Sequence, residues 1–324
     1  MKKIFLFAAA AMVSLSSCVQ TEDVYTGGLN EMGFKSAVTR AIITGTEFEG
    51  AISVSSVWDN PNDSENYVEY FSNIEFALTD GVWKANPAKY WPSSGNMQFL
   101  ALYPKAQTDV DITTNTDGTF DSVKTKNVID NNIVDQHDVL FSDLLAVEAP
   151  QESAQPLLFH HALAQLNVTL KKAETGAVVV VNSVKVVKAY LQGKLAVNTT
   201  ADVSANMANG LKTEAEWSEK AEMDRYFLAD ANAVSVDDCY TATLTTDSQS
   251  PAALLVIPGA QTKIVIEYTV DGKAQTYTHT LTGNWDMGYK YTYNYTINVN
   301  EIMFDCEVED WKPAAGGDIT IGQI

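Results

Sequence analysis

Positive charge is scarce in this sequence. Its 324 residues include 21 lysines and arginines against 41 aspartates and glutamates, which gives a formal net charge of −20 at pH 7. A chain this acidic is repelled by nucleic acid and by anionic membrane surfaces, so nucleic acid is excluded as a partner. Apolar residues make up 46% of the chain, an ordinary fraction for a globular protein. The acidity therefore belongs to the surface and does not indicate disorder.

Motifs that carry catalysis are also missing. The chain contains no GxSxG, HExxH, GxGxxG, GKS or GKT sequence. His160 and His161 are adjacent, so on a strand they point to opposite faces and do not share a metal. No cysteine or carboxylate stands near them at a spacing typical of zinc sites. We therefore expect no enzyme, no cofactor and no metal, with one of these histidines buried and the other exposed.

Long hydrophobic runs are confined to the start of the chain. Lys2 and Lys3 precede an apolar stretch, Ile4 to Val13, that is too short to span a bilayer as a helix. This arrangement is typical of a signal peptide, which we place at 1–17. The sequence Leu15-Ser16-Ser17-Cys18 resembles a bacterial lipobox, so Cys18 is the predicted lipidation site. The acidic pair Glu22-Asp23 resembles a signal for export to the outer face of the outer membrane.

Cysteine and arginine are both rare. Once Cys18 is assigned to lipidation, only Cys239 and Cys306 remain. In an oxidising compartment these two either pair or stay as thiols, and the sequence leaves both outcomes open. The only arginines are Arg40 and Arg225.

Patterns typical of β-strands are abundant in this sequence. Residues 289–299 alternate strictly, with Tyr and aliphatic side chains on one face and Lys, Thr and Asn on the other. Residues 263–281 predict a hairpin that turns at Asp271-Gly272. Residues 177–197 predict two further strands, and 214–227 is the one helical candidate. Many strands between Gly, Pro and Asn predict an all-β sandwich architecture with few short helices.

Several motifs, taken in order, resemble the fimbrillins of Bacteroidales. They are "TRAIITG" from residue 39, "YWP" at 90–92, "FLALYP" at 99–104, "FHHALAQLNVTL" at 159–170, and "GNWDMGYKYTYNYTINV" followed by "VEDW" at 308–311. The resemblance covers nearly the whole chain. It implies two transthyretin-like β-sandwich domains in tandem and a role in type V pili. It also implies that an arginine-specific protease cuts between Arg40 and Ala41.

These arguments divide the chain into five parts. We expect a signal peptide at 1–17, a lipidated tether or propeptide at 18–40, an N-terminal β-sandwich domain at 41–155, a C-terminal β-sandwich domain at 156–311 and a donor-strand segment at 312–324. The Pro-rich stretch 147–156 suggests the domain boundary.

The C-terminal segment ends on an alternating pattern in which Ile319 and Ile321 flank Thr320. In the family such a segment fills a groove in another subunit by strand addition, which implies that these residues form a donor strand. Ile324 is out of phase with the other two isoleucines and is expected at the end of the paired stretch. The alternative that the segment folds back onto its own domain stays open.

The resulting hypothesis is a structural subunit of a cell-surface fimbrium, with the stalk favoured over the tip and an adhesive activity left open. Its expected partners are other fimbrial subunits in a homopolymer or mixed fibre, the processing protease, the outer membrane through the lipid before cleavage, and ligands on host or bacterial surfaces. The alternative is a surface glycan-binding lipoprotein of a polysaccharide-uptake system, which would share the lipobox and the β-sandwiches.

Overall fold

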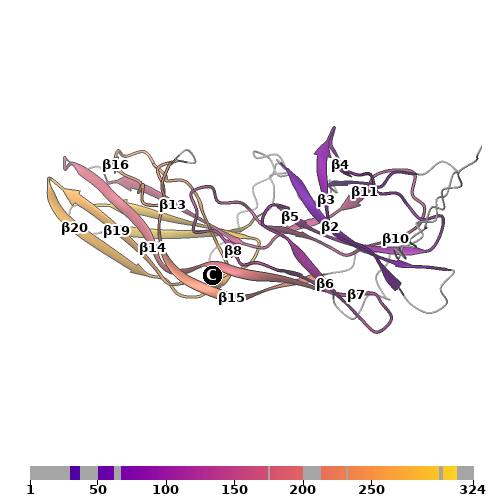
Figure 1. Ribbon diagram of the computed structural model, residues 1–324. Helices are drawn as coiled ribbons and strands as arrows, with labels where there is room; N and C mark the ends of the chain where they lie inside the picture. The colour runs from indigo at the N-terminus through magenta and orange to yellow at the C-terminus, as the bar shows by residue number, and fades with distance from the viewer. Residues whose placement is uncertain are drawn as a thin grey trace, which may run out of the picture.

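The computed structural model describes residues 30–36, 50–61, 67–173, 176–199, 213–230, 233–298 and 302–311. In these residues the chain is entirely β-structure without a helix, and the molecule is elongated (Figure 1). The N-terminal strands lie at one end and the strands after residue 254 lie at the other. The expectation of a few short helices is therefore wrong for the described residues, which also include no helix able to cross a membrane.

The first sheet has nine strands in the order β11-β1-β4-β3-β2-β5-β9-β12, and β10 pairs with β5. Its members are β1 (Gly33–Ser36), β2 (Ala51–Asp59), β3 (Tyr67–Thr79), β4 (Val82–Ala85), β5 (Asn96–Tyr103), β9 (Leu140–Ser142), β10 (Leu145–Glu148), β11 (Gln155–Leu157) and β12 (Phe159–His161).

The second sheet runs along the molecule. Its eight strands follow the order β20-β19-β14-β7-β6, with β8, β15 and β16 also paired to β14. They are β6 (Val110–Thr114), β7 (Phe120–Thr125), β8 (Ile129–Asp130), β14 (Val179–Thr199), β15 (Thr213–Tyr226), β16 (Ala242–Thr243), β19 (Lys263–Val270) and β20 (Lys273–Thr280). Because the 21-residue β14 pairs with β19 near its start and with β7 near its end, hydrogen bonds join the two ends of the molecule.

The third sheet packs against the second. It has four strands in the order β17-β13-β22-β23, and a separate two-stranded sheet joins β18 to β21. These strands are β13 (Ala164–Lys172), β17 (Leu254–Val256), β18 (Gly259–Ala260), β21 (Asn284–Trp285), β22 (Tyr289–Ile297) and β23 (Ile302–Asp310). Tyr291, Tyr293 and Tyr295 of β22 are buried in the core between these sheets. The alternating pattern of this strand is thus confirmed.

Three apolar clusters form the core. One lies within the first sheet, one lies between β13, β14, β19 and β22, and the third joins them. The joining cluster brings Leu100 and Phe120 from the first half together with Leu195, Trp217 and Ile257 from the second. The two halves therefore share buried apolar surface as well as a sheet.

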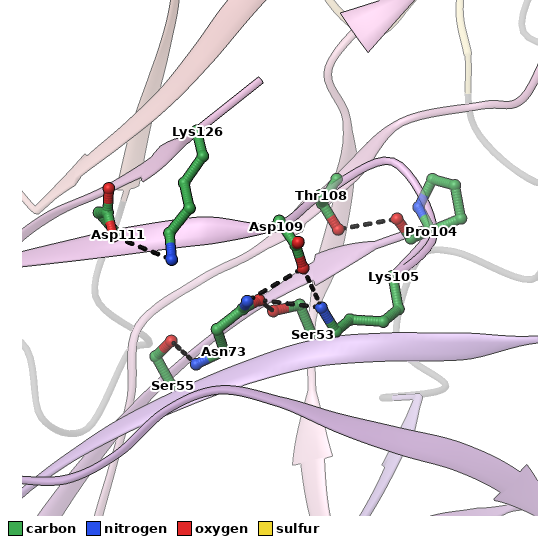
Figure 2. A network of polar contacts seen from close by, with 9 residues as sticks. All are labelled: Ser53, Ser55, Asn73, Pro104, Lys105, Thr108, Asp109, Asp111 and Lys126. Carbon is green, nitrogen blue, oxygen red and sulfur yellow. Dashed lines mark hydrogen bonds and ion pairs between the residues drawn. The ribbon is translucent and has the colours of Figure 1, made fainter. Parts of the chain in front are cut away.

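A polar network fixes a bulge in the first sheet (Figure 2). Asn73 has a positive φ of 56°, beside the register shift that follows Val54 in β2. Ser53 Oγ donates to Asn73 Oδ1 over 2.8 Å, and the Asn73 backbone N–H donates to Ser55 Oγ over 3.0 Å. Lys105 Nζ donates to Asn73 Oδ1 over 3.2 Å and also contacts Asp109. The bulge is thus tied to the turn that follows β5.

The hairpin expected at residues 263–281 is confirmed as β19 and β20. Its turn residues Asp271 and Gly272 have φ values of 48° and 78°, as a two-residue turn with left-handed backbone requires.

Two expectations about secondary structure are wrong. Residues 214–227 are not helical, because β15 covers 213–226 and pairs with β14 over most of its length. Ala215, Trp217 and Met223 alternate with exposed residues, and this tertiary pairing outweighs the helix propensity of the glutamates. Residues 177–197 also contain one strand, β14, which begins at Val179, instead of two, because bulges bend it without ending it.

Strands on both sides of the boundary expected at residue 155 belong to the first sheet. β11 spans residue 155 and β12 lies entirely after it. β11 pairs with β1 and β12 pairs with β9, both in the first sheet. The chain leaves this sheet only after His161, and β13 begins at Ala164. The Pro-rich stretch 147–156 thus connects β10 to β11 within the first sheet.

Candidate functional site

The first described strand, β1, occupies an internal position in the first sheet. It runs antiparallel to β4, with Gly33 opposite Lys84 and Phe34 opposite Trp83. On its other side it runs parallel to β11, with Phe34 opposite Gln155. Residues 33–36, which belong to the lipidated tether or propeptide expected at 18–40, thus complete the sheet between two strands that come later in the chain.

Two side chains at the start of this segment belong to the core, one in β1 and one directly before it. Met32 and Phe34 are both fully buried, in the cluster that also contains Trp83 and Trp91. The ring of Phe34 lies 5.2 Å from that of Phe76 and 5.1 Å from that of Phe99, in edge-to-face geometry. Each such buried side chain contributes about 1.5–3 kcal/mol to holding the strand in place.

Polar contacts hold the start of the same segment. The Met32 N–H donates to the Lys89 carbonyl over 2.7 Å, and the Trp91 N–H donates to the Asn30 carbonyl over 3.0 Å. Lys84 Nζ lies 2.7 Å from Glu31 Oε2, an ion pair that is partly exposed and therefore weak. The strand is thus docked by its backbone and by two apolar anchors more than by charge.

Gly33 lies close to side chains next to β1 in the sheet and in the chain. A Cβ atom added here would lie 2.9 Å from Cγ1 of Val82 and 3.6 Å from Cβ of Ala154. Any strand that takes this position needs a glycine here or a shift of the Val82 side chain.

The covalent link between β1 and the rest of the sheet passes through Arg40. β1 ends at Ser36 and β2 begins at Ala51, so the peptide bond after Arg40 lies in the connection between them. A cut at this bond would leave β1 attached by noncovalent contacts alone. Arg40 and Ala41 themselves lie outside the described residues.

Other residues singled out in the sequence also lie outside the described part of the chain. They are the lipidation residue Cys18 and the donor-strand residues Ile319, Thr320, Ile321 and Ile324.

The two remaining cysteines are free thiols, so the pair that the sequence left open is not formed in this structure. The backbone of Cys239 forms an isolated antiparallel β-bridge with Leu228, whereas Cys306 lies in β23 opposite Tyr293. Burial, followed by the nearby carboxylates Asp305 and Glu307, raises the pKa of the Cys306 thiol to about 11. Cys306 is thus protonated and unreactive at neutral pH.

The adjacent histidines divide as expected, with His161 largely buried and His160 more exposed. Each has a carboxylate partner that sequence spacing did not reveal: His160 Nε2 lies 3.0 Å from Asp143, and His161 Nδ1 lies 2.6 Å from Asp138. The His161 ring also stacks on Trp311, with centroids 3.9 Å apart. This stack holds Trp311, the last described residue of the chain, against the start of the link between β12 and β13.

Most tryptophans serve the core. Trp83, Trp91 and Trp285 are buried, and Trp285 Nε1 donates to the hydroxyl of Tyr293 over 2.8 Å. These three are therefore unavailable for stacking on a sugar. No cluster of metal-ligating side chains occurs in the described residues.

Comparison with known proteins points to one family. A family model described as fimbrillin-like matches residues 39–311, a span that begins next to Arg40 and leaves β1 outside. None of the curated proteins compared with the chain matches it.

Solved structures share the fold. The chain is similar to a fimbrial protein from Bacteroides vulgatus, with 17% identity, a TM-score of 0.57 and coverage of 87% of this chain and 99% of that one. It is also similar to a candidate cell adhesion protein from Bacteroides uniformis, with 17% identity, a TM-score of 0.51 and coverage of 88% and 100%.

Proposed function

This chain belongs to the fimbrillin-like family, and we propose that it is a structural subunit, in the stalk rather than at the tip, of a cell-surface fimbrium. The observation that carries the proposal is the position of β1. This strand completes the first sheet and fills its core, yet it precedes Arg40 in the chain.

Proteolysis at Arg40 would turn a stable strand into an exchangeable one. Before the cut, β1 is tethered and the groove between β4 and β11 is filled. After the cut, release of β1 would expose unpaired backbone on both strands and the apolar slots of Met32 and Phe34. The arginine-specific protease is in this proposal the trigger for assembly.

The C-terminal segment of a second subunit suits this groove. Ile319 and Ile321 have the same spacing as Met32 and Phe34, so both can enter the vacated slots on one face of the strand. In that register Thr320 takes the place of Gly33 and crowds Val82. Shifting by two residues would put Gly322 there, but it would bury Gln323 in the slot of Phe34. We favour the first register because it requires only a shift of Val82, which is half-buried at the start of β4. The second register requires burial of the Gln323 amide, which costs more free energy.

Strand addition of this kind builds a filament. The donor is at the C-terminus and the groove is in the N-terminal sheet, so the contact is head-to-tail and does not close on itself. The shared sheet and shared core between the two halves would keep each subunit stiff along the fibre.

Export and anchoring belong to the same proposal. The signal peptide and acylation at Cys18 would deliver the precursor to the outer membrane, and the cut after Arg40 would free the subunit from its lipid. Two sandwich domains, with the boundary moved past His161, would then make up the mature subunit.

The proposal is tested by treating the purified precursor with an arginine-specific protease and separating the products on an unboiled denaturing gel. A ladder of multimers is expected from the whole chain. A chain truncated after Trp311 should be cut equally well and remain a folded monomer. Ladders from the truncated chain would show that the C-terminal segment is not the donor, whereas a loss of several degrees in melting temperature would show that it packs on its own subunit.

A further inference from the structure

The outward face of the third sheet carries a cavity of about 360 Å³ that plays no part in the assembly described above. It lies over β13, β22 and β23, on the side opposite the buried tyrosines. Ser248, in the loop that pairs with β13 at Leu170, closes one side.

Strand register arranges the floor of the cavity in two short rows. Thr169, Asn294 and Asp305 are consecutive partners across the three strands, and Lys171, Thr296 and Met303 form the next row on the same face. Neighbours within a row are about 5 Å apart, and the rows are separated by about 7 Å along the strands. The six side chains therefore form a patch with the dimensions of a single sugar ring and its substituents.

The groups on this patch match the hydroxyls of a sugar. Threonine hydroxyls and the asparagine amide both donate and accept hydrogen bonds, a carboxylate accepts them and an ammonium donates them. Asn294 is positioned by its hydrogen bond with Thr169 and by a longer one, 3.4 Å, to Glu307. Among the described residues the side chains of Lys171 and Thr296 have no hydrogen-bond partner, so their polar groups are free for a ligand.

Met303 distinguishes this patch from an ordinary solvated sheet face. It is 50% exposed on a face whose other members are polar or charged. The neighbouring Phe304 points to the other face of β23, where its ring lies 5.4 Å from that of Tyr295, so Met303 supplies the apolar wall. An apolar wall beside a hydroxyl-binding floor suits a pyranose ring, which has an apolar C–H face and polar edges.

We propose that this cavity binds a neutral monosaccharide unit of a surface glycan. The charges of Lys171 and Asp305 cancel, while Glu307 and the net charge of −20 disfavour sulfated, phosphorylated or sialylated sugars. A volume of about 360 Å³ is at the lower end of the range for small-ligand pockets, about 300–1,000 Å³, and fits one or two sugar rings. Repetition of the site along a fibre would raise weak single-site binding by avidity.

The test uses the purified full chain as a monomer, so it is independent of whether the chain polymerises. The probes are the methyl glycosides of galactose, N-acetylgalactosamine, N-acetylglucosamine, fucose and mannose. Their binding is measured by saturation-transfer NMR. We expect at least one of them to bind. Thr296→Val and Met303→Ala should each weaken that binding by about fivefold, the equivalent of one lost hydrogen bond or contact.

Thr292→Val is the matched control, because Thr292 lies on the same strand and face but outside the cavity. It should leave binding unchanged, and all variants should keep the melting temperature of the parent. The proposal is overturned if no glycoside binds, if Thr292→Val weakens binding as much as Thr296→Val, or if a sialylated or sulfated glycoside binds more tightly than the neutral ones.

Discussion

The ring of Phe34 lies edge-to-face against the ring of Phe99 with a centroid separation of 5.1 Å, although the peptide bond after Arg40 separates them in the chain. Phe34 belongs to the segment that cleavage would detach, and Phe99 belongs to the part that remains. The core of the first sheet thus depends on a residue that the proposed maturation makes removable.

Phe34→Ala should therefore destabilise the uncleaved chain by about 3–5 kcal/mol, the usual cost of removing a buried phenylalanine. Lys35→Ala, on the exposed side of the same strand, is the control and should change stability little. Chemical denaturation of both variants measures the difference. Equal stability of the two variants would mean that β1 contributes nothing to the core.

An arginine-specific protease should cut the folded chain once, although the sequence has two arginines. Arg225 is only 2% exposed, within β15, and its Nη2 donates to the Ile133 carbonyl over 2.8 Å. A strand held in a sheet cannot enter a protease cleft without local unfolding. Mass spectrometry of a limited digest should find a new N-terminus at Ala41 and none at Tyr226. Cleavage at Tyr226 under native conditions would contradict the packing described for β15.

Polymerisation should depend on which side chains of the C-terminal segment enter the groove. Ile321→Asp would place a charge in the slot of Met32 or Phe34 and should abolish the ladder of multimers. Thr320→Gly would remove the Cβ atom that crowds Val82 and should leave assembly intact or make it faster. Gln323→Asn is the control. If Thr320→Asp blocks assembly and Ile321→Asp does not, the donor enters with the opposite face inward.

The network around Asn73 should make stability depend on acid pH. Hydrogen bonds from Lys105 and then from Asn73 lower the pKa of Asp109 below its ordinary value. A carboxyl whose folded pKa is lowered binds fewer protons in the folded state, so its contribution is complete above the ordinary value, about 3.9, and is lost as the pH falls through the lower folded value. The effect should be small, because Asp109 is exposed and screened by solvent.

Lys105→Met tests this sign. The melting temperature of the variant should be lower than that of the parent at neutral pH. This difference should narrow as the pH falls below the ordinary pKa of an aspartate, about 3.9, and through the lower value in the folded chain. Lys126→Met removes a more exposed ion pair, in which Lys126 Nζ lies 3.2 Å from Asp111 Oδ1. Its melting temperature should differ less from that of the parent at every pH. If the difference in melting temperature between Lys105→Met and the parent widens in acid, the stabilising role proposed for the ion pair is wrong.

Local pattern in the sequence was enough for the elements whose burial follows from alternation. The tyrosines of β22 and the Asp271-Gly272 turn were predictable because a strand with one buried face repeats every second residue and a two-residue hairpin requires left-handed backbone. The lipobox and the order of the aromatic motifs likewise predicted the family without any contact between distant residues.

The sequence alone did not predict which strands pair across long distances. Residues 214–227 resemble a helix by composition and become a strand because β14 offers them a partner. Met32 and Phe34 make a pattern too short to stand out, and they become core residues because Trp83, Phe76 and Phe99 enclose them. Those partners are supplied by strands that follow in the chain. The role of β1 was therefore decided by the tertiary structure, since no local signal in residues 30–36 records the groove that they fill.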